Sequence, residues 1–191
     1  MQKAEENLVD GDGLLVIDIQ RDFCPGGALP IAGGDLVVPV INGWIAAAVR
    51  NKVPIYYSRD WHPRGHPSFK KNGGDWPEHC VQDTPGAAFH PALDLAPDPV
   101  VISKGSRFDQ NQLSVFNHTG FADKLRLDGV KRLWLAGLAL DVCVLETALD
   151  GVRAGFKVAV VVEACRPVTG EGGRQALDAM RRAGVYLTTD N

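Results

Sequence analysis

Six short apolar runs, rich in Val, Ile and Leu, recur along the chain. Within each run the apolar character is continuous more than strictly alternating, which is typical of strands covered on both faces. The pattern therefore predicts the buried strands of a parallel sheet. The predicted strands are Leu14–Ile19, Val53–Ser58, Val100–Ser103, Arg132–Leu138, Lys157–Val162 and Val185–Thr188.

Several of the segments between these runs have apolar residues at helical spacing. Leu36–Arg50 has Asp35 as a candidate N-cap and Pro39 in its first turn, where proline is tolerated. Val142–Arg153 and Glu171–Ala183 show the same spacing. Strands and helices in alternation predict an α/β fold, with a three-layer open parallel β-sheet of about six strands and helices on both faces. We expect residues 1–191 to form a single domain.

Composition narrows the classes of function. The chain has 191 residues, 45% of them hydrophobic, and a formal net charge of −3, so it has no basic surplus with which to bind nucleic acid. No apolar run reaches the roughly 20 residues that span a bilayer, and Met1–Gly13 lacks the apolar stretch of a secretion signal. The four cysteines do not indicate a disulfide framework. We therefore expect a cytoplasmic protein.

One long segment, Asp60–Pro99, breaks the alternation of strands and helices. It contains seven prolines, four glycines and four of the five histidines. A loop region of this length inside a compact domain is usually functional or disordered, and its aromatic residues argue against disorder. We therefore expect a ligand, such as a metal ion, to organise it.

Reactive side chains come at the ends of the predicted strands. Asp18 lies at the end of the first run, Asp60 and His62 follow the second, Lys104 follows the third and Cys143 follows the fourth. In an open α/β sheet, ligands bind outside the carboxyl ends of the strands. An acid, a metal-binding pair, an ammonium and a thiol are therefore predicted to meet at one edge of the sheet.

Cys143 opens a predicted helix, where the exposed N–H groups would stabilise a thiolate and an oxyanion. Asp18 could take the thiol proton, and Lys104 could hold the two groups together. Each residue also has an ordinary interpretation. Cys143 could be a buried structural cysteine, Asp18 a loop or capping aspartate, and Lys104 a solvated surface lysine.

Asp60 and His62 stand two residues apart, so both side chains point to one side of an extended segment. With His66 and His79 further along, a carboxylate and two or three imidazoles suit Zn²⁺, Fe²⁺ or Mn²⁺. The alternative is a structural zinc site built from His62, His66, His79 and Cys80, whose spacing matches no zinc-finger pattern.

Together these segments match a known set of sequence motifs, and the chain resembles the nicotinamidases of the isochorismatase-like cysteine hydrolase superfamily. The resemblance covers about Leu14 to Val185. Its motifs are Leu15–Phe23 with Gly26–Leu29, Arg59–Pro63, His66 with Ser68 and Phe69, Trp76–Gln82, Lys104 with Gly105, and Gly137–Val144.

The resemblance implies a role for each matching residue. Asp18, Lys104 and Cys143 would form a catalytic triad. Asp60, His62 and His79 would bind one divalent metal ion, most simply zinc, with His66 a further candidate ligand. Backbone N–H groups of Ala139 and Cys143 would form the oxyanion hole beside a cis peptide bond joining Leu138 to Ala139. Phe23, Trp76, Leu138 and Ala139 would contact the substrate.

The implied reaction is deamidation of nicotinamide to nicotinate and ammonia through a cysteine thioester, with pyrazinamide and related pyridine carboxamides as further substrates. Family members are often oligomers, so the resemblance is compatible with a homo-oligomer of this chain. Leu140 and Asp83 stand where the family commonly has Thr and Gly, and we expect them to border the pocket. The alternatives are a metal-free isochorismatase-like or N-carbamoyl amide hydrolase, and a non-catalytic binding subunit on the same fold.

Overall fold

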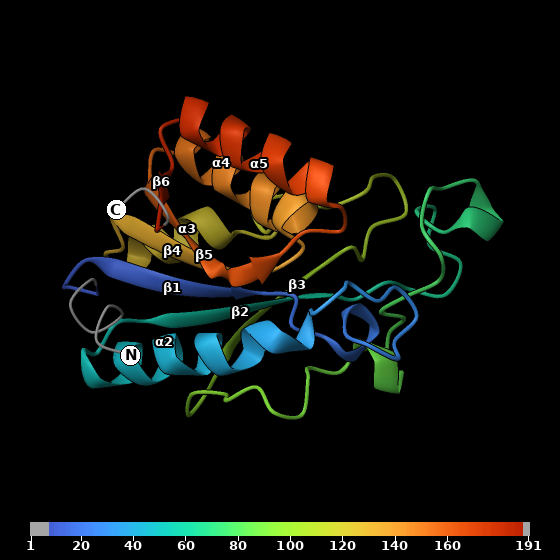
Figure 1. Ribbon diagram of the computed structural model, residues 1–191, viewed down its shortest axis with the longest axis horizontal. Helices are drawn as coiled ribbons and strands as arrows, with labels where there is room; N and C mark the ends of the chain where they lie inside the picture. Colours follow the sequence, from blue (N-terminus) through green and yellow to red (C-terminus); the bar gives the residue numbers. More distant parts are fainter. Residues whose placement is uncertain (1–7, 189–191) are drawn as a thin grey trace.

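The computed structural model describes residues 8–188, and the six apolar runs form one parallel sheet in it (Figure 1). The strand order is β3-β2-β1-β4-β5-β6, so the expected α/β architecture is confirmed. Of the polar N-terminal stretch, residues 1–7 lie outside the described residues. The strands are β1 (Asp12–Ile17), β2 (Ile55–Asp60), β3 (Val100–Lys104), β4 (Arg132–Leu138), β5 (Lys157–Arg166) and β6 (Tyr186–Leu187).

Helices cover both faces of the sheet (Figure 1). Leu14 and Val16 of β1 belong to the core under the first helix, and Leu15 and Ile17 belong to the core under the other three. Burial on both faces explains why the strand sequence is apolar without alternation. The helices are α2 (Val38–Arg50) on one face, and α3 (Phe121–Leu127), α4 (Leu145–Arg153) and α5 (Gly170–Arg182) on the other.

Strand β1 begins and ends two residues earlier than the apolar run predicts. The reason is Asp12, a charged residue whose carboxylate is buried and accepts hydrogen bonds from Arg132 (2.6 and 2.8 Å) and from the indole N–H of Trp134 (3.2 Å). Paired in this way, Asp12 can occupy a position that hydropathy assigns to a loop. Asp18 consequently lies just beyond the strand, with a left-handed backbone (φ 51°).

Two further expectations differ from the structure. Asp35 does not cap α2, because Asp35–Val37 forms its own 3₁₀ turn and the helix starts at Val38 with no side-chain cap. The short helix α3 was not predicted, since its seven residues are too few for a periodic signal. Pro39 does lie in the first turn of α2. Among residues 8–188, no helix combines the length and the apolar character needed to cross a membrane.

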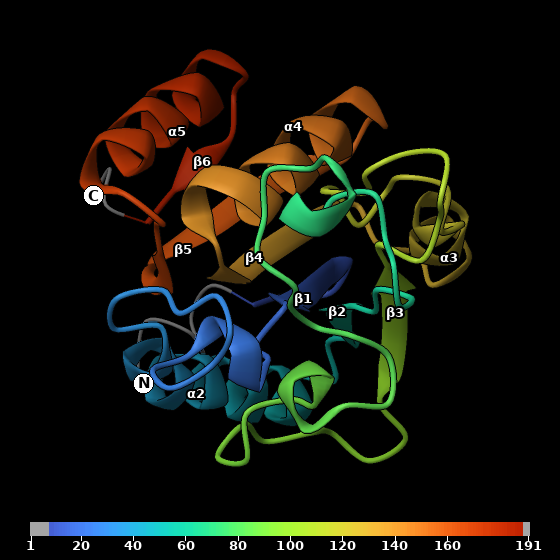
Figure 2. The same ribbon diagram turned by 90° about the vertical axis from the view of Figure 1, so that its right-hand side faces the viewer.

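The chain places β2 and β3 on one side of β1 and then returns to place β4 on the other side. Such a reversal opens a crevice at the carboxyl ends of the central strands. Residues 90–99 run back beside α2 to the start of β3 (Figure 1), whereas residues 61–89 lie across this end of the sheet (Figure 2). They are ordered by 3₁₀ turns at Lys70–Asn72 and Pro85–Ala87, and by short pairings of His62 with Val81 and of Phe69 with Trp76.

Candidate active site

Three side chains from separate strands meet in the crevice. Lys104, the last residue of β3, is fully buried, and its Nζ lies 2.8 Å from Asp18 Oδ2 and 3.3 Å from Cys143 Sγ. Asp18 follows β1, and its Oδ1 accepts a hydrogen bond from Ser58 Oγ (2.7 Å). The predicted convergence of acid, ammonium and thiol is therefore present within contact distance.

Burial sets the protonation of these groups. Burial raises the pKa of Asp18, although Lys104 opposes the shift, and burial likewise raises the pKa of Cys143 well above its ordinary value. Burial alone would lower the pKa of Lys104, but Asp18 and Asp60 outweigh it and raise that pKa. The result is a permanent ammonium between an acid of increased basicity and a thiol that is protonated at rest.

The turn that carries Cys143 differs from the expected helix start. Leu140–Val144 forms a wide π-helical turn, closed by a hydrogen bond from Val144 N–H to the Ala139 carbonyl (3.0 Å), and α4 begins only at Leu145. The expected cis peptide bond between Leu138 and Ala139 is present. Burial raises the pKa of the Cys143 thiol and outweighs the stabilisation of a thiolate that the helix start was expected to give.

A second cluster lies beside the triad. Asp60, His62 and His79 are all buried, and each offers a ligand atom within 4.8 Å of the others. Asp60 Oδ2 is 3.7 Å from His62 Nε2 and 3.9 Å from His79 Nε2. Two ligands held by a tetrahedral zinc ion lie about 3.4 Å apart, so these spacings are close to those of a metal site.

Hydrogen bonds at the far side of each imidazole orient this cluster. His62 Nδ1 lies 2.7 Å from the Gly105 carbonyl, and His79 Nδ1 lies 2.7 Å from the Pro77 carbonyl. Because a carbonyl only accepts, each Nδ1 donates, and each Nε2 keeps a lone pair directed at Asp60. The donor set and its orientation therefore fit a divalent cation such as zinc.

His66 and Cys80 lie outside this donor set. The Nε2 of His66 donates to the Arg107 carbonyl (2.7 Å), and its Nδ1 pairs with Ser68 Oγ (2.7 Å), so neither nitrogen is directed at the cluster. His66 instead packs against the His62 ring, with centroids 4.4 Å apart. The four-residue structural zinc site does not assemble among the described residues, since Cys80 contributes no ligand atom to the cluster.

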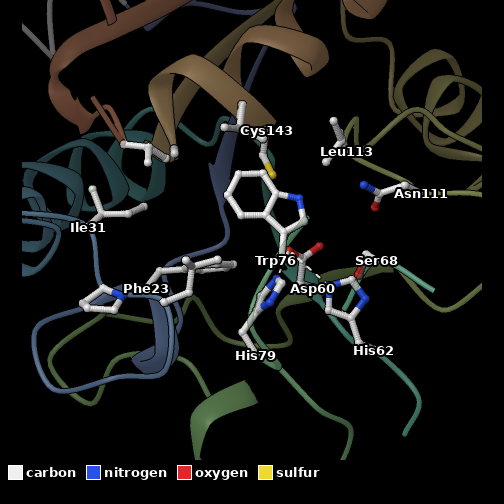
Figure 3. Close-up of a pocket in the computed structure, with 15 residues that line it drawn as sticks. Phe23, Ile31, Asp60, His62, Ser68, Trp76, His79, Asn111, Leu113 and Cys143 are labelled. Carbon is white, nitrogen blue, oxygen red and sulfur yellow. Dashed lines mark ion pairs between the residues drawn. The ribbon is translucent and has the colours of Figure 1, made fainter. Parts of the chain in front are cut away.

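A cavity opens over Cys143 and the metal-type residues (Figure 3), while Asp18 and Lys104 are fully buried and do not line it. Phe23 and Trp76 form aromatic walls, and Ala139 and Cys143 border the cavity at its nucleophile end. Leu138, expected to contact the substrate, instead has its side chain fully buried in the core. Further lining residues include Leu29 and Ser68, which belong to the motifs of the resemblance, and four that were not singled out from the sequence: Ile31, Asn111, Leu113 and Val168.

Of the four lining residues that were not singled out, only Val168 had a signal in the sequence. Val168 follows β5 and could have been found by extending the strand-end rule to that strand. Asn111 and Leu113 come from an irregular loop that no periodicity marks. Leu140 and Asp83, expected to border the cavity, do not line it. Asp83 adopts a left-handed backbone (φ 62°), a conformation in which glycine is the usual residue.

Comparison with known proteins matches residues 12–191 to the family described as Isochorismatase domain. The nicotinamidase of Acinetobacter baylyi is 35% identical over 195 residues, which cover 90% of this chain and 89% of that protein. The pyrazinamidase of Pyrococcus horikoshii, solved in complex with zinc, is 42% identical, with a TM-score of 0.90 over 93% of this chain and 98% of that one. PnC1 from L. infantum, solved in complex with nicotinate, is 34% identical, with a TM-score of 0.86 over 94% of this chain and 93% of that one.

Proposed function

This chain belongs to the isochorismatase family, and we propose that it is a zinc-containing amidase that converts nicotinamide to nicotinate and ammonia. The observation that carries the proposal is the position of Lys104. Its Nζ contacts the acid Asp18 and the thiol of Cys143 on one side, and Asp60 of the metal-type cluster on the other (2.6 Å). Lys104 therefore links the triad to the metal-type cluster, and Cys143, Asp60, His62 and His79 line one cavity.

The first step is attack by the cysteine. Asp18 accepts the proton of Cys143 as the sulfur attacks the carboxamide carbon, and the raised pKa of Asp18 makes it a suitable base. Lys104 keeps the acid and the sulfur in contact and stabilises the negative charge that develops. We assign the backbone N–H groups of Ala139 and Cys143 to the oxyanion of the tetrahedral intermediate.

Collapse of that intermediate breaks the carbon–nitrogen bond. Asp18 returns its proton to the leaving nitrogen, so ammonia departs and a thioester remains on Cys143. Water, deprotonated by Asp18, then attacks the thioester carbonyl, and the sulfur leaves with the proton to regenerate the thiol. The same carboxyl thus acts as base and acid in alternation.

Asp60, His62 and His79 would hold the zinc ion, which when bound supplies a Lewis acid for a ring nitrogen of the substrate. Phe23 and Trp76 would pack against the faces of the ring. An apolar cavity with aromatic walls suits a flat heterocycle, so we include pyrazinamide and related pyridine carboxamides among the substrates.

Two other functions are less well supported. A metal-free amide hydrolase would have no use for two imidazoles whose lone pairs are directed at one buried carboxylate. A non-catalytic binding subunit would gain nothing from a buried lysine in contact with both a carboxylate and a thiol. We also propose that the protein acts in the cytoplasm, since its four cysteines are free and buried. Because members of the family are often oligomers, a homo-oligomer is the state to test.

Ammonia release from nicotinamide tests the function. Purified protein should release ammonia and form nicotinate in equal amounts. Turnover should fall after treatment with a chelator and return on addition of zinc. Unchanged turnover after metal removal, verified by elemental analysis, would favour the metal-free hydrolase, and no turnover on any carboxamide would favour the binding subunit.

A further inference from the structure

Gln20 is a fully buried polar residue two positions after the catalytic acid. Its side-chain amide forms hydrogen bonds with three backbone groups. Its Oε1 accepts from the N–H of Asp60 (2.8 Å), and its Nε2 donates to the carbonyls of Asp60 (2.7 Å) and Ala87 (2.9 Å). A single side chain therefore holds both peptide groups of Asp60.

The sheet explains why Asp60 needs this support. The last residues paired between β1 and β2 are Ile17 and Ser58, and beyond them the chain turns away at Asp18. On its other side, the end of β2 remains paired to β3, since Trp61 N–H donates to the Lys104 carbonyl (2.9 Å). Gln20 supplies the hydrogen bonds that a continued β1 would have made to Asp60.

We propose that Gln20 is a positioning residue for Asp60 and thereby for both the metal cluster and Lys104. The Asp60 carboxylate directs Oδ1 to Lys104 and Oδ2 to the two imidazoles. A shift of its backbone would move both oxygens together. Loss of Gln20 therefore weakens zinc binding and misplaces the ammonium beside the nucleophile. The inference rests on the proposed function for its kinetic part only.

The contact with Ala87 extends the same support to the loop region. Ala87 lies in the 3₁₀ turn Pro85–Ala87, and this turn is also paired with the backbone around Gln20, because Arg21 N–H donates to Ala88 and His90 N–H donates to Ile19. Gln20 therefore links the end of β1, the end of β2 and one turn of the 60–99 loop. A residue with three such links fixes the relative position of those segments.

Two substitutions test the proposal in the holoenzyme. Gln20→Glu keeps the shape but replaces the donor with an oxygen that faces two carbonyls, and Gln20→Asn keeps the amide but draws it back by one methylene. Loss of groups that orient metal ligands commonly costs about 10- to 100-fold in metal affinity or activity. We expect zinc affinity, measured by competition with a chromogenic chelator, to fall by that amount, and kcat to fall with KM changed less than about threefold.

Asn42 offers a matched control. Its side-chain amide also holds a backbone pair, donating to the Ala92 carbonyl (2.8 Å) and accepting from Asp94 N–H (3.0 Å), and neither partner belongs to the site. Asn42→Asp introduces the same amide-to-carboxylate change as Gln20→Glu. It should lower the melting temperature slightly and leave zinc affinity and kcat at wild-type values.

The outcomes separate the possible readings. If folded Gln20→Asn binds zinc and turns over like the wild type, the positioning role is wrong, and it is equally wrong if Asn42→Asp loses zinc to the same extent. If Gln20→Glu does not fold, Gln20→Asn decides alone. Should the wild type bind zinc without hydrolysing nicotinamide, the proposed function fails, while the zinc affinities of the variants still test the role of Gln20.

Discussion

Lys104 donates a hydrogen bond to Asp60 Oδ1 at 2.6 Å, while the other oxygen of that carboxylate faces His62 and His79. The lysine of the triad and the metal cluster therefore share one carboxylate. Burial would raise the pKa of Asp60, but the Lys104 ammonium holds it well below its ordinary value, so the group stays ionised. The shared carboxylate therefore couples the triad and the metal cluster electrostatically.

Removal of the nucleophile should separate chemistry from metal binding. We expect Cys143→Ala to lower kcat by on the order of 10⁴-fold or more, because no other described thiol reaches Lys104, while zinc content stays at the wild-type level. Ammonia release and elemental analysis on one preparation measure both. Cys165→Ala is the control, since that thiol is buried in β5 with its pKa raised to about 12, and its loss should leave turnover intact. Near-normal activity of Cys143→Ala would refute the mechanism.

Loss of the buried ammonium should destabilise the fold. In Lys104→Met, Asp18 and Asp60 would remain buried without their cation, and an uncompensated buried charge typically costs about 3–5 kcal/mol. Denaturant titration of the variant and the wild type measures the difference in free energy of unfolding. Lys124→Met provides the comparison, because its pair with Asp128 is solvent-exposed and should contribute less than about 1 kcal/mol. Equal losses in the two variants would contradict this account of the triad.

Strand β4, which precedes the turn that carries Cys143, leaves no room for a side chain at Gly137. A Cβ there would lie 2.1 Å from the Ile17 carbonyl oxygen, at a φ of 137° that L-residues rarely adopt. Gly137→Ala should cost more than about 4 kcal/mol and yield little soluble protein. Gly155→Ala, with a φ of 91° but no atom within 4 Å of the new Cβ, should cost only about 1 kcal/mol. Soluble yield and melting temperature test the contrast, which fails if both variants behave alike.

Acid should weaken the contact between β2 and the end of α3. Hydrogen bonds from Lys124 and from the Tyr56 hydroxyl lower the pKa of Asp128 below its ordinary value of 3.8. A lowered carboxyl pKa adds stability above the ordinary value, and this stability is lost as pH falls through the folded-state value. Asp128→Asn should therefore be less stable by about 0.5–1 kcal/mol at pH 7, with the gap closing as the pH falls below 3.8 and through the lower folded-state pKa.

The control for this pH dependence lies on the same helix. Asp123 is largely exposed and pairs with Arg126 across one turn of α3, so Asp123→Asn should change the free energy of unfolding by only a few tenths of a kcal/mol at either pH. A gap for Asp128→Asn that stays constant from pH 7 to pH 3 would show that shape, not charge, sets its contribution.

The sequence predicted the strands and the convergence of reactive groups for one physical reason. Parallel strands bring their carboxyl ends to one edge, so Asp18, Lys104 and Cys143 could be placed together from the strand assignments alone. The register of β1 could not be obtained in this way, because it depends on the hydrogen-bonded pairing of Asp12 with Arg132, a residue 120 positions away. Hydropathy along the chain carries no information about such a partner.

Part of the cavity wall and the support of Asp60 were also beyond the sequence pattern. Asn111 and Leu113 reach the cavity only because of the path of an irregular loop. Gln20 reads as an ordinary polar residue after a strand, and its role depends on the exact point at which β1 and β2 part. Positions of this kind are set by tertiary contacts, which local propensity does not encode.

The return of the chain to the far side of β1 has a consequence for how activity arises during folding. The first three strands position Asp18 and Lys104, whereas Cys143 reaches the site only when β4 pairs with β1. An N-terminal fragment ending before β4 would carry the acid, the lysine and the metal-type residues without a nucleophile. Recovery of turnover after dilution from denaturant would therefore report the pairing of β4 with β1.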